Sequence, residues 1–331
     1  MPSSEGRKPN YSRRFLWLGI FIAILFGGYS AAWFYAAGKV EAFATAAIAA
    51  LNRDGKSADC ADVTTQGYPF RIGVFCDSVR FDDSSQGVAA SAAAFRSAAQ
   101  VYDPFHIVAE LDGPAAISAP KLGQIGLNWD NLRASVRLTT DFPEQLSVEA
   151  DGLAAEGSAG DAAATSLLKV GHAEGHMRQH GSDLDLAARF TDARLDPKLT
   201  KGAVLPPLSG ETDLTVNDGV KLVRIGDGSL RGYSGTIRTL TLSTGETTGL
   251  SVAGPFSVSA QGLLDADFTV SVRNPKALSE QLAKTFPAQA DQIKMSFSGL
   301  AALGDNPSLP LKVTGGKATL GFIPLGNIPP L

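Results

Sequence analysis

The stretch Ala58–Phe81, ADCADVTTQGYPFRIGVFCDSVRF, predicts two β-strands joined by a turn. Cys60 and Cys76 each lie eight residues from Tyr68, and a glycine and a proline flank that tyrosine. Glycine and proline interrupt strands, so we expect the turn around Tyr68. The symmetric spacing therefore predicts a β-hairpin that carries one cysteine on each strand.

The register of this hairpin decides whether the two cysteines meet. If residues 66–70 form the loop, Thr65 faces Arg71 and the count brings Cys60 opposite Cys76, within reach of a disulfide. Closing a loop of about 15 residues is worth roughly 3 kcal/mol on the chain-entropy model. The chain has no other cysteine, whereas a zinc site needs three or four ligands. We expect a structural disulfide and no metal site; a redox-active pair is the alternative, but the Cys-x-x-Cys spacing is missing.

Upstream of the hairpin, Phe15–Ala37 (FLWLGIFIAILFGGYSAAWFYAA) has no charged residue in 23 positions. As a helix it would rise about 34 Å, which is long enough to span a bilayer. Basic residues in the tail 1–14 place that tail in the cytoplasm by the positive-inside bias, and Trp17 and Trp33 suit the two interfaces. The sequence predicts a single-pass inner-membrane anchor at 15–37, with everything after it in the periplasm.

A cleaved signal peptide is the alternative to this signal-anchor. Ser30-Ala31-Ala32 resembles a small-x-small processing site, and Gly27-Gly28 could end the apolar helix. However, apolar residues continue at helical spacing beyond that site, through Val40, Phe43 and Leu51. We therefore expect an uncleaved anchor followed by a juxtamembrane helix within 38–55, which extends to about Asn52.

The remaining segment, 56–331, is predicted to be a β-rich periplasmic domain. Many short runs alternate apolar and polar residues between Gly, Pro, Asn and Asp, which is typical of antiparallel strands with one buried face. The clearest runs are Leu132–Leu138, Leu184–Phe190, Phe256–Ala260 and Leu264–Val272. The fold expected is mainly β, an elongated antiparallel domain behind a transmembrane helix.

One minor helical segment interrupts the predicted strands. Asn274-Pro275 suits the start of a helix, and Leu278 and Leu282 lie four residues apart on one face. A second helical turn is expected at 288–293. The Ala- and Gly-rich segment 154–165 and Pro206-Pro207 are candidate divisions of the domain, but no change of composition is sharp enough to predict two cores.

Composition excludes several classes of protein. With 331 residues, 44% of them hydrophobic and 19% charged, the chain can bury a sizeable core and is not mainly disordered. The first 14 residues carry four basic and one acidic side chain, and the rest carries 25 basic and 32 acidic ones. A nucleic acid is therefore not an expected partner.

The order of several short motifs resembles a known family. After the anchor come Gly67-Tyr68-Pro69-Phe70-Arg71, Gln100-Val101-Tyr102-Asp103-Pro104, Glu110-Leu111-Asp112-Gly113-Pro114, Gly321-Phe322-Ile323-Pro324-Leu325 and Ile328-Pro329-Pro330. This order is similar to that of the uncharacterised alphaproteobacterial envelope proteins of domain-of-unknown-function family 2125. The resemblance implies a single-pass inner-membrane protein with a periplasmic β-rich domain and brings no established activity. A looser likeness, of architecture alone, is to the AsmA-type envelope proteins, which are associated with lipid.

Candidate chemistry is sparse. His172, His176 and His180 lie four residues apart; on a helix they would share a face and could bind a metal, but glycines disfavour a helix there. On a strand the outer two would be about 26 Å apart, so a solvated polar face is the favoured interpretation. Ser166-Leu167-Leu168-Lys169 matches a Ser-x-x-Lys pattern without the supporting motifs. Two further segments, Gly232-Tyr233-Ser234-Gly235 and Gly226-Asp227-Gly228, are interpreted as turns.

Two apolar segments have a structural and a functional interpretation. Tyr68, Phe70 and Arg71 are expected to pack in the hairpin loop, and the alternative is a contact with the membrane or a partner beside the anchor. The C-terminal LGFIPLGNIPPL at 320–331 is expected to form a last strand and a tail that closes the core; a docking tail is the alternative.

The function expected from these features is non-enzymatic, with no cofactor and no catalytic residue. We expect the strands to form an apolar groove that binds or handles membrane lipid, at a distance from the bilayer fixed by the anchor. A structural or assembly scaffold for envelope proteins, with a filled core and protein partners, is the first alternative. A periplasmic hydrolase is the second, and it requires a nucleophile and a base that converge only in the fold.

Overall fold

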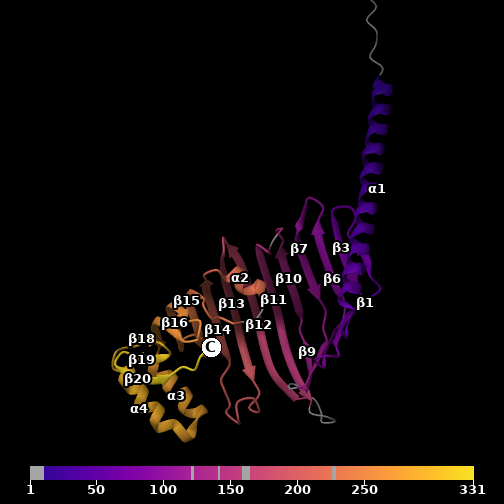
Figure 1. Cartoon of the computed structure of the whole chain (residues 1–331). Coiled ribbons are helices and arrows are strands. Elements are labelled where there is room, and N and C mark those ends of the chain that lie inside the picture. Colours follow the sequence, from indigo (N-terminus) through magenta and orange to yellow (C-terminus); the bar gives the residue numbers. More distant parts are fainter. Residues whose placement is uncertain (1–10, 121–122, 141, 159–164, 226–228) are drawn as a thin grey trace, which may run out of the picture.

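The computed structural model describes residues 11–120, 123–140, 142–158, 165–225 and 229–331. The protein is mainly β, as the sequence predicts: a long apolar helix at the N-terminal end is followed by a large antiparallel sheet (Figure 1). The helices are α1 (Tyr11–Leu51), α2 (Gly219–Ile225), α3 (Pro275–Thr285), the 3₁₀ turn η1 (Pro287–Gln289) and α4 (Ala290–Ala301).

The first ten strands follow α1 directly. They are β1 (Lys56–Ala61), β2 (Thr64–Gln66), β3 (Arg71–Cys76), β4 (Ser78–Asp83), β5 (Val88–Ala92), β6 (Phe95–Gln100), β7 (Asp103–Leu111), β8 (Ala115–Ala119), β9 (Gly123–Asn128) and β10 (Asn131–Arg137). Longer strands come next: β11 (Gln145–Ser158), β12 (Thr165–His180), β13 (Asp183–Leu195), β14 (Leu208–Val216), β15 (Ser234–Ser243), β16 (Gly249–Val258) and β17 (Leu264–Arg273). The sheet ends with β18 (Ser308–Thr314), β19 (Lys317–Leu320) and β20 (Ile323–Asn327).

The sheet is a meander in which each length of chain pairs with the length before it. From β11 onward, consecutive strands pair antiparallel up to β20. Before β11, each pass of the chain is two strands in line with a short break between them, as in β9 and β10. β9 and β10 both form hydrogen bonds with the continuous strand β11: β10 pairs with the first half of β11 and β9 with its second half.

These breaks form one line across the sheet, which we call the crease. They lie at Asp62–Val63, Asp77, Ala93–Ala94, Asp112–Pro114 and Trp129–Asp130. In β11 the line passes through Gly152, whose φ is 62°, and a Cβ there would lie 2.2 Å from Asp130 Oδ2. An L side chain at Gly152 would meet both a strained backbone and a clash, so glycine is required at this point. The sheet can therefore bend along the crease while its hydrogen bonds continue on both sides.

The disulfide shows toward which face the sheet bends. Cys60 and Cys76 are disulfide-bonded, with their Cα atoms 5.3 Å apart. Cys60 is paired with Val79, three residues beyond Cys76, so in a flat sheet the two cysteines would be about 10 Å apart along the strands. The fold brings them together across the crease, and the cysteine side of the sheet is thus its inner side.

The register predicted for the first hairpin is wrong by three residues. Thr65 pairs with Val74 rather than with Arg71, and β1 pairs with β4, so Cys60 is not directly opposite Cys76. The prediction assumed a loop symmetric about Tyr68. In the structure the loop is asymmetric, because Arg71 and the next residue pair with β6 on the other side.

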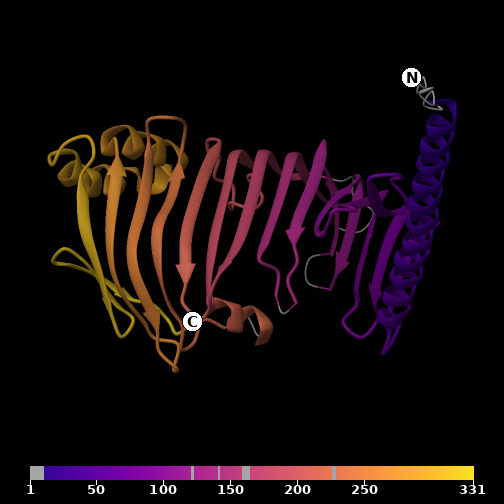
Figure 2. The same cartoon turned by 90° about the horizontal axis from the view of Figure 1, so that it is seen from above.

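Two ends of the sheet are covered by helices (Figure 2). At the N-terminal end, α1 contacts β1, β2 and β3, and it buries Trp33 and Ala37, which are 5% and 6% exposed. At the C-terminal end, Ala266, Phe268, Val313 and Ala318 form a core cluster on which Ile328 packs. One compact core cluster thus lies where the last strands curl, and a second buried group, Leu184, Val216 and Val220, lies where α2 packs on β13.

The predicted helices are present with altered bounds. α1 continues unbroken to Leu51, and α3 begins at Pro275 with the side chain of Asn274 accepting the amide of Ala277 at 3.1 Å. The second helical turn, expected at 288–293, is instead α4, which extends to Ala301. The short helix α2 was not predicted, because seven residues give too few turns for a periodic signal.

We expect the double variant C60S/C76S to fold but to lose stability, by about 2–4 kcal/mol of unfolding free energy on the chain-entropy model. Denaturant titration of the purified full chain measures this loss. Mass analysis of non-reduced peptides from the unaltered protein should recover the two cysteine peptides linked. Two alkylatable thiols in protein taken from membranes would contradict the disulfide.

Candidate functional site

The inner side of the sheet carries continuous rows of apolar side chains. Residues paired across antiparallel strands point to the same face, so a row can be followed from strand to strand. One row crosses nine strands without a polar residue: Ile72, Ala99, Ile107, Val136, Leu146, Met177, Leu186, Leu214 and Ile237. At about 4.8 Å between strands this row is roughly 38 Å long.

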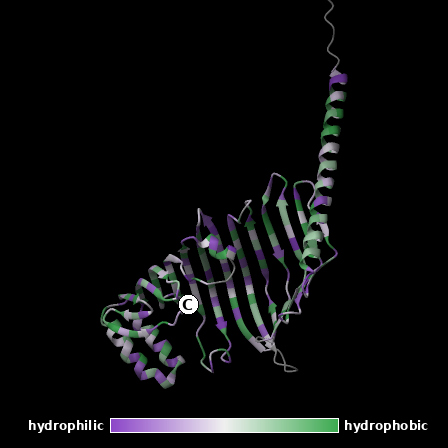
Figure 3. Ribbon diagram, in the orientation of Figure 1, coloured by the Kyte–Doolittle hydropathy of each residue, from purple (hydrophilic) through white to green (hydrophobic). Residues whose placement is uncertain are grey.

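A second apolar row lies across the crease from the first. It consists of Cys60, Val79, Ala92, Ala115, Leu127, Ala155, Leu168 and Leu195. Because Cys60 is bonded to Cys76, this row points to the same inner side as Ile72 and its partners. The two limbs of the bent sheet therefore enclose an apolar trough, whose strands alternate in hydropathy along their length (Figure 3).

The middle of the trough is open to solvent. Leu240, Leu242 and Leu250, on the inner side of β15 and β16, are 44%, 47% and 40% exposed. Leu146 and Val148 of β11 are also exposed. Aliphatic side chains on adjacent strands that no other part of the described chain covers form a binding surface for an apolar ligand.

At the N-terminal end, α1 covers the trough but does not fill it. A cavity of about 830 Å³ lies between one face of α1, from Ala36 to Ile48, and the inner side of the sheet. Its sheet wall includes Ile72 and Ile107 of the first row and both Cys60 and Val79 of the second. The cavity is therefore continuous with both apolar rows. The volume of this cavity is larger than that of a single side chain, and it lies in the range of small-molecule binding sites.

The predicted loop residues Tyr68, Phe70 and Arg71 lie beside α1. Tyr68 packs edge-on against Trp33, and its hydroxyl lies 2.8 Å from the Ser30 hydroxyl. The Arg71 carbonyl accepts the indole N–H of Trp33 at 2.9 Å. The Phe70 side chain makes no such contact with the described residues of α1, and it is 67% exposed. Two of the three thus fix the loop to the helix, and the aromatic ring of the third is free to contact another surface.

The outer side of the sheet is polar. Its central row reads Arg96, Glu110, Arg133, Glu149, Glu174, Arg189 and Glu211 across β6, β7 and β10–β14. Arg96 donates two hydrogen bonds of 2.7 and 2.6 Å to Asp112, which lies in the crease, and this pairing lowers the pKa of Asp112. The outer side is thus suited to water and the inner side to hydrocarbon.

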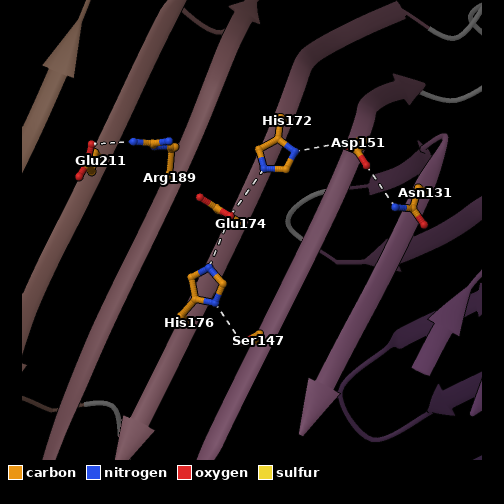
Figure 4. A network of polar contacts seen from close by, with 8 residues as sticks. All are labelled: Asn131, Ser147, Asp151, His172, Glu174, His176, Arg189 and Glu211. Carbon is orange, nitrogen blue, oxygen red and sulfur yellow. Dashed lines mark hydrogen bonds and ion pairs between the residues drawn. The ribbon is translucent and has the colours of Figure 1, made fainter. Parts of the chain in front are cut away.

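The histidines predicted to form a polar face do so on β12. His172 Nδ1 lies 2.7 Å from Asp151 Oδ1, and His176 Nδ1 lies 2.9 Å from Ser147 Oγ (Figure 4). Between them, Glu174 is 3.8 and 3.5 Å from their Nε2 atoms. The strand conformation separates the histidines as expected, and each is oriented by a residue of the neighbouring strand.

Of the residues that the structure describes, Glu149, Asp151 and His172 have the spacing of metal ligands, with ligand atoms within 4.8 Å of one another. Asp151 already accepts the hydrogen bond of His172 and one from Asn131 at 3.1 Å. The hydrogen bond to Asp151 raises the pKa of His172, and the same bond lowers the pKa of Asp151. A charge-assisted hydrogen bond accounts for this group without an ion.

The other motifs do not assemble a catalytic group in the described part of the chain. Ser166 and Lys169 lie on β12, where Ser166 pairs with Glu156 and Lys169 with Arg194, and no hydrogen bond joins them. Ser234 begins β15 and its hydroxyl accepts Asn217 at 2.9 Å. The segment Gly226-Asp227-Gly228 lies outside the described residues.

The C-terminal run divides between the two predicted roles. Ile328 packs on the core cluster, as a tail that closes the core should. Phe322, Ile323 and Leu325, at and around β20, are instead exposed, with Phe322 97% exposed. The last strand is present, and its apolar side chains remain uncovered by the described residues.

Sequence reasoning missed two structural residues of the site. Trp129, at the crease, is buried and donates its indole N–H to the Leu111 carbonyl at 2.7 Å. Phe43 lines the cavity from α1, although it was identified only as part of a helical face. An isolated tryptophan between two strand-like runs is a signal for Trp129; nothing in the sequence locates the cavity wall opposite Phe43.

These features define a class of protein: an antiparallel β-meander bent into an apolar trough, behind an N-terminal helix that is apolar and long enough to cross a membrane. The chain belongs to the DUF2125 family, described as uncharacterized proteins conserved in bacteria, whose model matches residues 33–329. The family resemblance stated from the motifs is thereby confirmed. A comparison with curated proteins finds no match. The likeness to AsmA-type proteins stays an expectation from architecture alone.

The His172–Asp151 pair gives a pH-dependent prediction. His172 has a higher pKa in the folded protein than in the unfolded chain. Its contribution to the free energy of unfolding is therefore complete below its unfolded pKa and is lost as pH rises through its folded pKa. The Asp151 contribution is lost as pH falls through its lowered pKa. We expect Asp151→Asn to lower the pKa of His172 in an NMR titration, with Ser147→Ala leaving it unchanged. Equal His172 pKa values in the D151N variant and the parent would contradict the pairing.

Proposed function

We propose that this protein is a membrane-anchored periplasmic envelope protein that binds the acyl chains of membrane lipid in its apolar trough, without catalysing a reaction. The observation that carries the proposal is the nine-strand row from Ile72 to Ile237, which contains no polar side chain. Such a surface favours a hydrocarbon ligand, because the surface offers no hydrogen-bond partner to a polar ligand.

The position of the trough supports a lipid over other apolar ligands. Its covered end lies against α1, whose N-terminal part is apolar and exposed on all sides. A bilayer is the environment that such a helix requires. The trough then begins beside the membrane in which its ligand is dissolved.

A scaffold for envelope proteins is the alternative with an observation in its favour. The exposed Phe322, Ile323 and Leu325 at the end of the sheet could pack on a protein partner. A scaffold, however, predicts a filled core, and the exposed side chains of Leu240, Leu242 and Leu250 favour an open trough. A hydrolase has less support, because Ser166 and Lys169 are not hydrogen-bonded to each other.

Two double variants test the lipid proposal; one alters the inner side of the sheet and the other alters the outer side. Leu242 and Leu250 are paired on the inner side, and the adjacent pair Thr241 and Ser251 lies on the outer side. In L242Q/L250Q, unpaired amides would face hydrocarbon at a cost of roughly 1–3 kcal/mol each. We expect protein purified from membranes to carry phospholipid or fatty acid detectable by mass spectrometry, and this variant to lose roughly tenfold or more of it.

The matched control is T241Q/S251Q, which adds the same amides to the outer side and should retain the lipid. Co-purification of stable protein partners without lipid would instead support the scaffold. Equal loss of lipid from both variants would contradict binding in the trough.

The topology of the chain provides a separate test. The basic tail and the uncharged run that follows predict that a reporter fused after Leu331 is active only if it requires export. The mature protein should keep its first 37 residues. A mature N-terminus at Trp33 would replace the anchor with a signal peptide, and a reporter active in the cytoplasm would contradict export.

A further inference from the structure

The cavity beneath α1 lies at a defined depth relative to the apolar part of that helix. α1 has 41 residues and is about 61 Å long, about twice the thickness of the hydrocarbon core. Its side chains are exposed from Tyr11 to Tyr29, and protein first buries a whole residue at Trp33. The helix therefore leaves the bilayer near Trp33, and the cavity, lined from Ala36 to Ile48, begins directly below.

Two loops extend above the cavity toward the bilayer. In the loop between β2 and β3, the Pro69 carbonyl accepts the hydroxyl of Tyr29. The turn between β6 and β7 is fixed to this loop, since the Val101 amide donates to the Phe70 carbonyl at 3.0 Å. Both loops lie at the edge of the sheet from which α1 projects (Figure 1). Their tips thus reach the level of Tyr29, about 6 Å farther along α1 into the bilayer than Trp33.

The tips of these loops carry uncovered apolar side chains. Phe70 is 67% exposed, Tyr102 is 78% exposed and Val101 is 41% exposed. Aromatic rings at this depth occupy the interface between hydrocarbon and water, where they are most stable. The loops would therefore hold the upper opening of the cavity in the interface of the leaflet on the exported side.

The cavity connects this opening to the trough. Val101 and Pro104 line it at the loop end, and Ile72, Ala99 and Ile107 of the nine-strand row line it farther in. The face that α1 presents is partly small, with alanines at 36, 44 and 47, and these short side chains leave a volume of about 830 Å³ unfilled between the helix and the sheet. An apolar passage thus extends from the depth of the interface to the start of the trough.

We propose that this cavity is the portal through which an acyl chain of a phospholipid in the exported leaflet passes between the bilayer and the trough. The proposal rests on the proposed function and adds the site and direction at which lipid exchanges. The headgroup would start at the loop tips, in the interface, and then follow the solvent-open side of the trough while the acyl chain passes between α1 and the sheet. Phe70 and Tyr102 keep the opening at membrane depth. The cavity wall is mostly apolar, with Asp59, Ser97 and Gln100 as its polar members, so it favours a hydrocarbon chain over water.

The test closes the portal without altering the trough. Ala44→Trp fills the cavity from α1, and Ala46→Trp adds the same side chain to α1 at a position outside the cavity lining. A photoreactive phenylalanine is placed at Phe43, in the portal, or at Leu250, in the trough. Each full-length protein is reconstituted in vesicles of phosphatidylethanolamine and phosphatidylglycerol with a trace of tritium-labelled phosphatidylethanolamine.

We expect both photoreactive positions to label with lipid in the unaltered background. Ala44→Trp should reduce labelling at Leu250 by roughly tenfold, because an overpacked cavity no longer accommodates the chain, whereas Ala46→Trp should leave it unchanged. Retention of the Cys60–Cys76 disulfide and of protease resistance serves as the folding control.

The two failures are distinguishable. Undiminished labelling at Leu250 in the A44W variant would overturn the portal and leave binding in the trough intact. Absence of lipid label at Leu250 in the unaltered background would overturn the proposed function itself. A second variant, F70S/Y102S, should also reduce labelling at Leu250 from vesicles; full labelling would overturn the role of the loop tips.

Discussion

Antiparallel pairing, interrupted along one line, is the constraint on which the rest of this structure depends. Because paired residues share a face, each strand that keeps the alternation extends the same apolar surface. Because the strands break or twist at the crease, that surface bends instead of remaining flat. The Cys60–Cys76 bond spans the inner side of the bend at the end nearest α1. One sheet thereby forms both walls of the trough without a second layer.

The division of polarity follows from this bend. A flat antiparallel sheet with an apolar face must cover it with a second layer, whereas here the limbs of the sheet partly cover each other. Charged residues such as Arg133 and Glu149 remain on the outer side, where water solvates them. The trough stays open at Leu242 and Leu250 because no element of the described chain packs there. The fold thus keeps apolar surface available, and a lipid ligand would give that surface a function.

α1 is joined to this sheet rigidly, and not as a flexible tether. The helix is continuous through Leu51, and Trp33 is fixed by a ring contact with Tyr68 and a hydrogen bond to Arg71. A rigid helix packed on the first strands fixes the orientation of the trough relative to the helix axis, and this orientation would carry over to a bilayer under the proposed function. The small residues on its inner face then decide whether the covered end is filled or hollow.

The sequence by itself determined the local elements: the apolar helix, the alternating strands such as 264–272, the Asn274 cap and the identity of the disulfide partners. Each of these depends on residues close in the chain or on the number of cysteines. Only the tertiary structure decided the register around Tyr68, the crease through Gly152 and the cavity opposite Phe43. The register depends on which later strand pairs with Arg71. The cavity depends on the distance between α1 and the sheet, which are brought together only by the fold. Neither quantity is encoded by periodicity, because periodicity specifies the face of a residue and not what lies across from it.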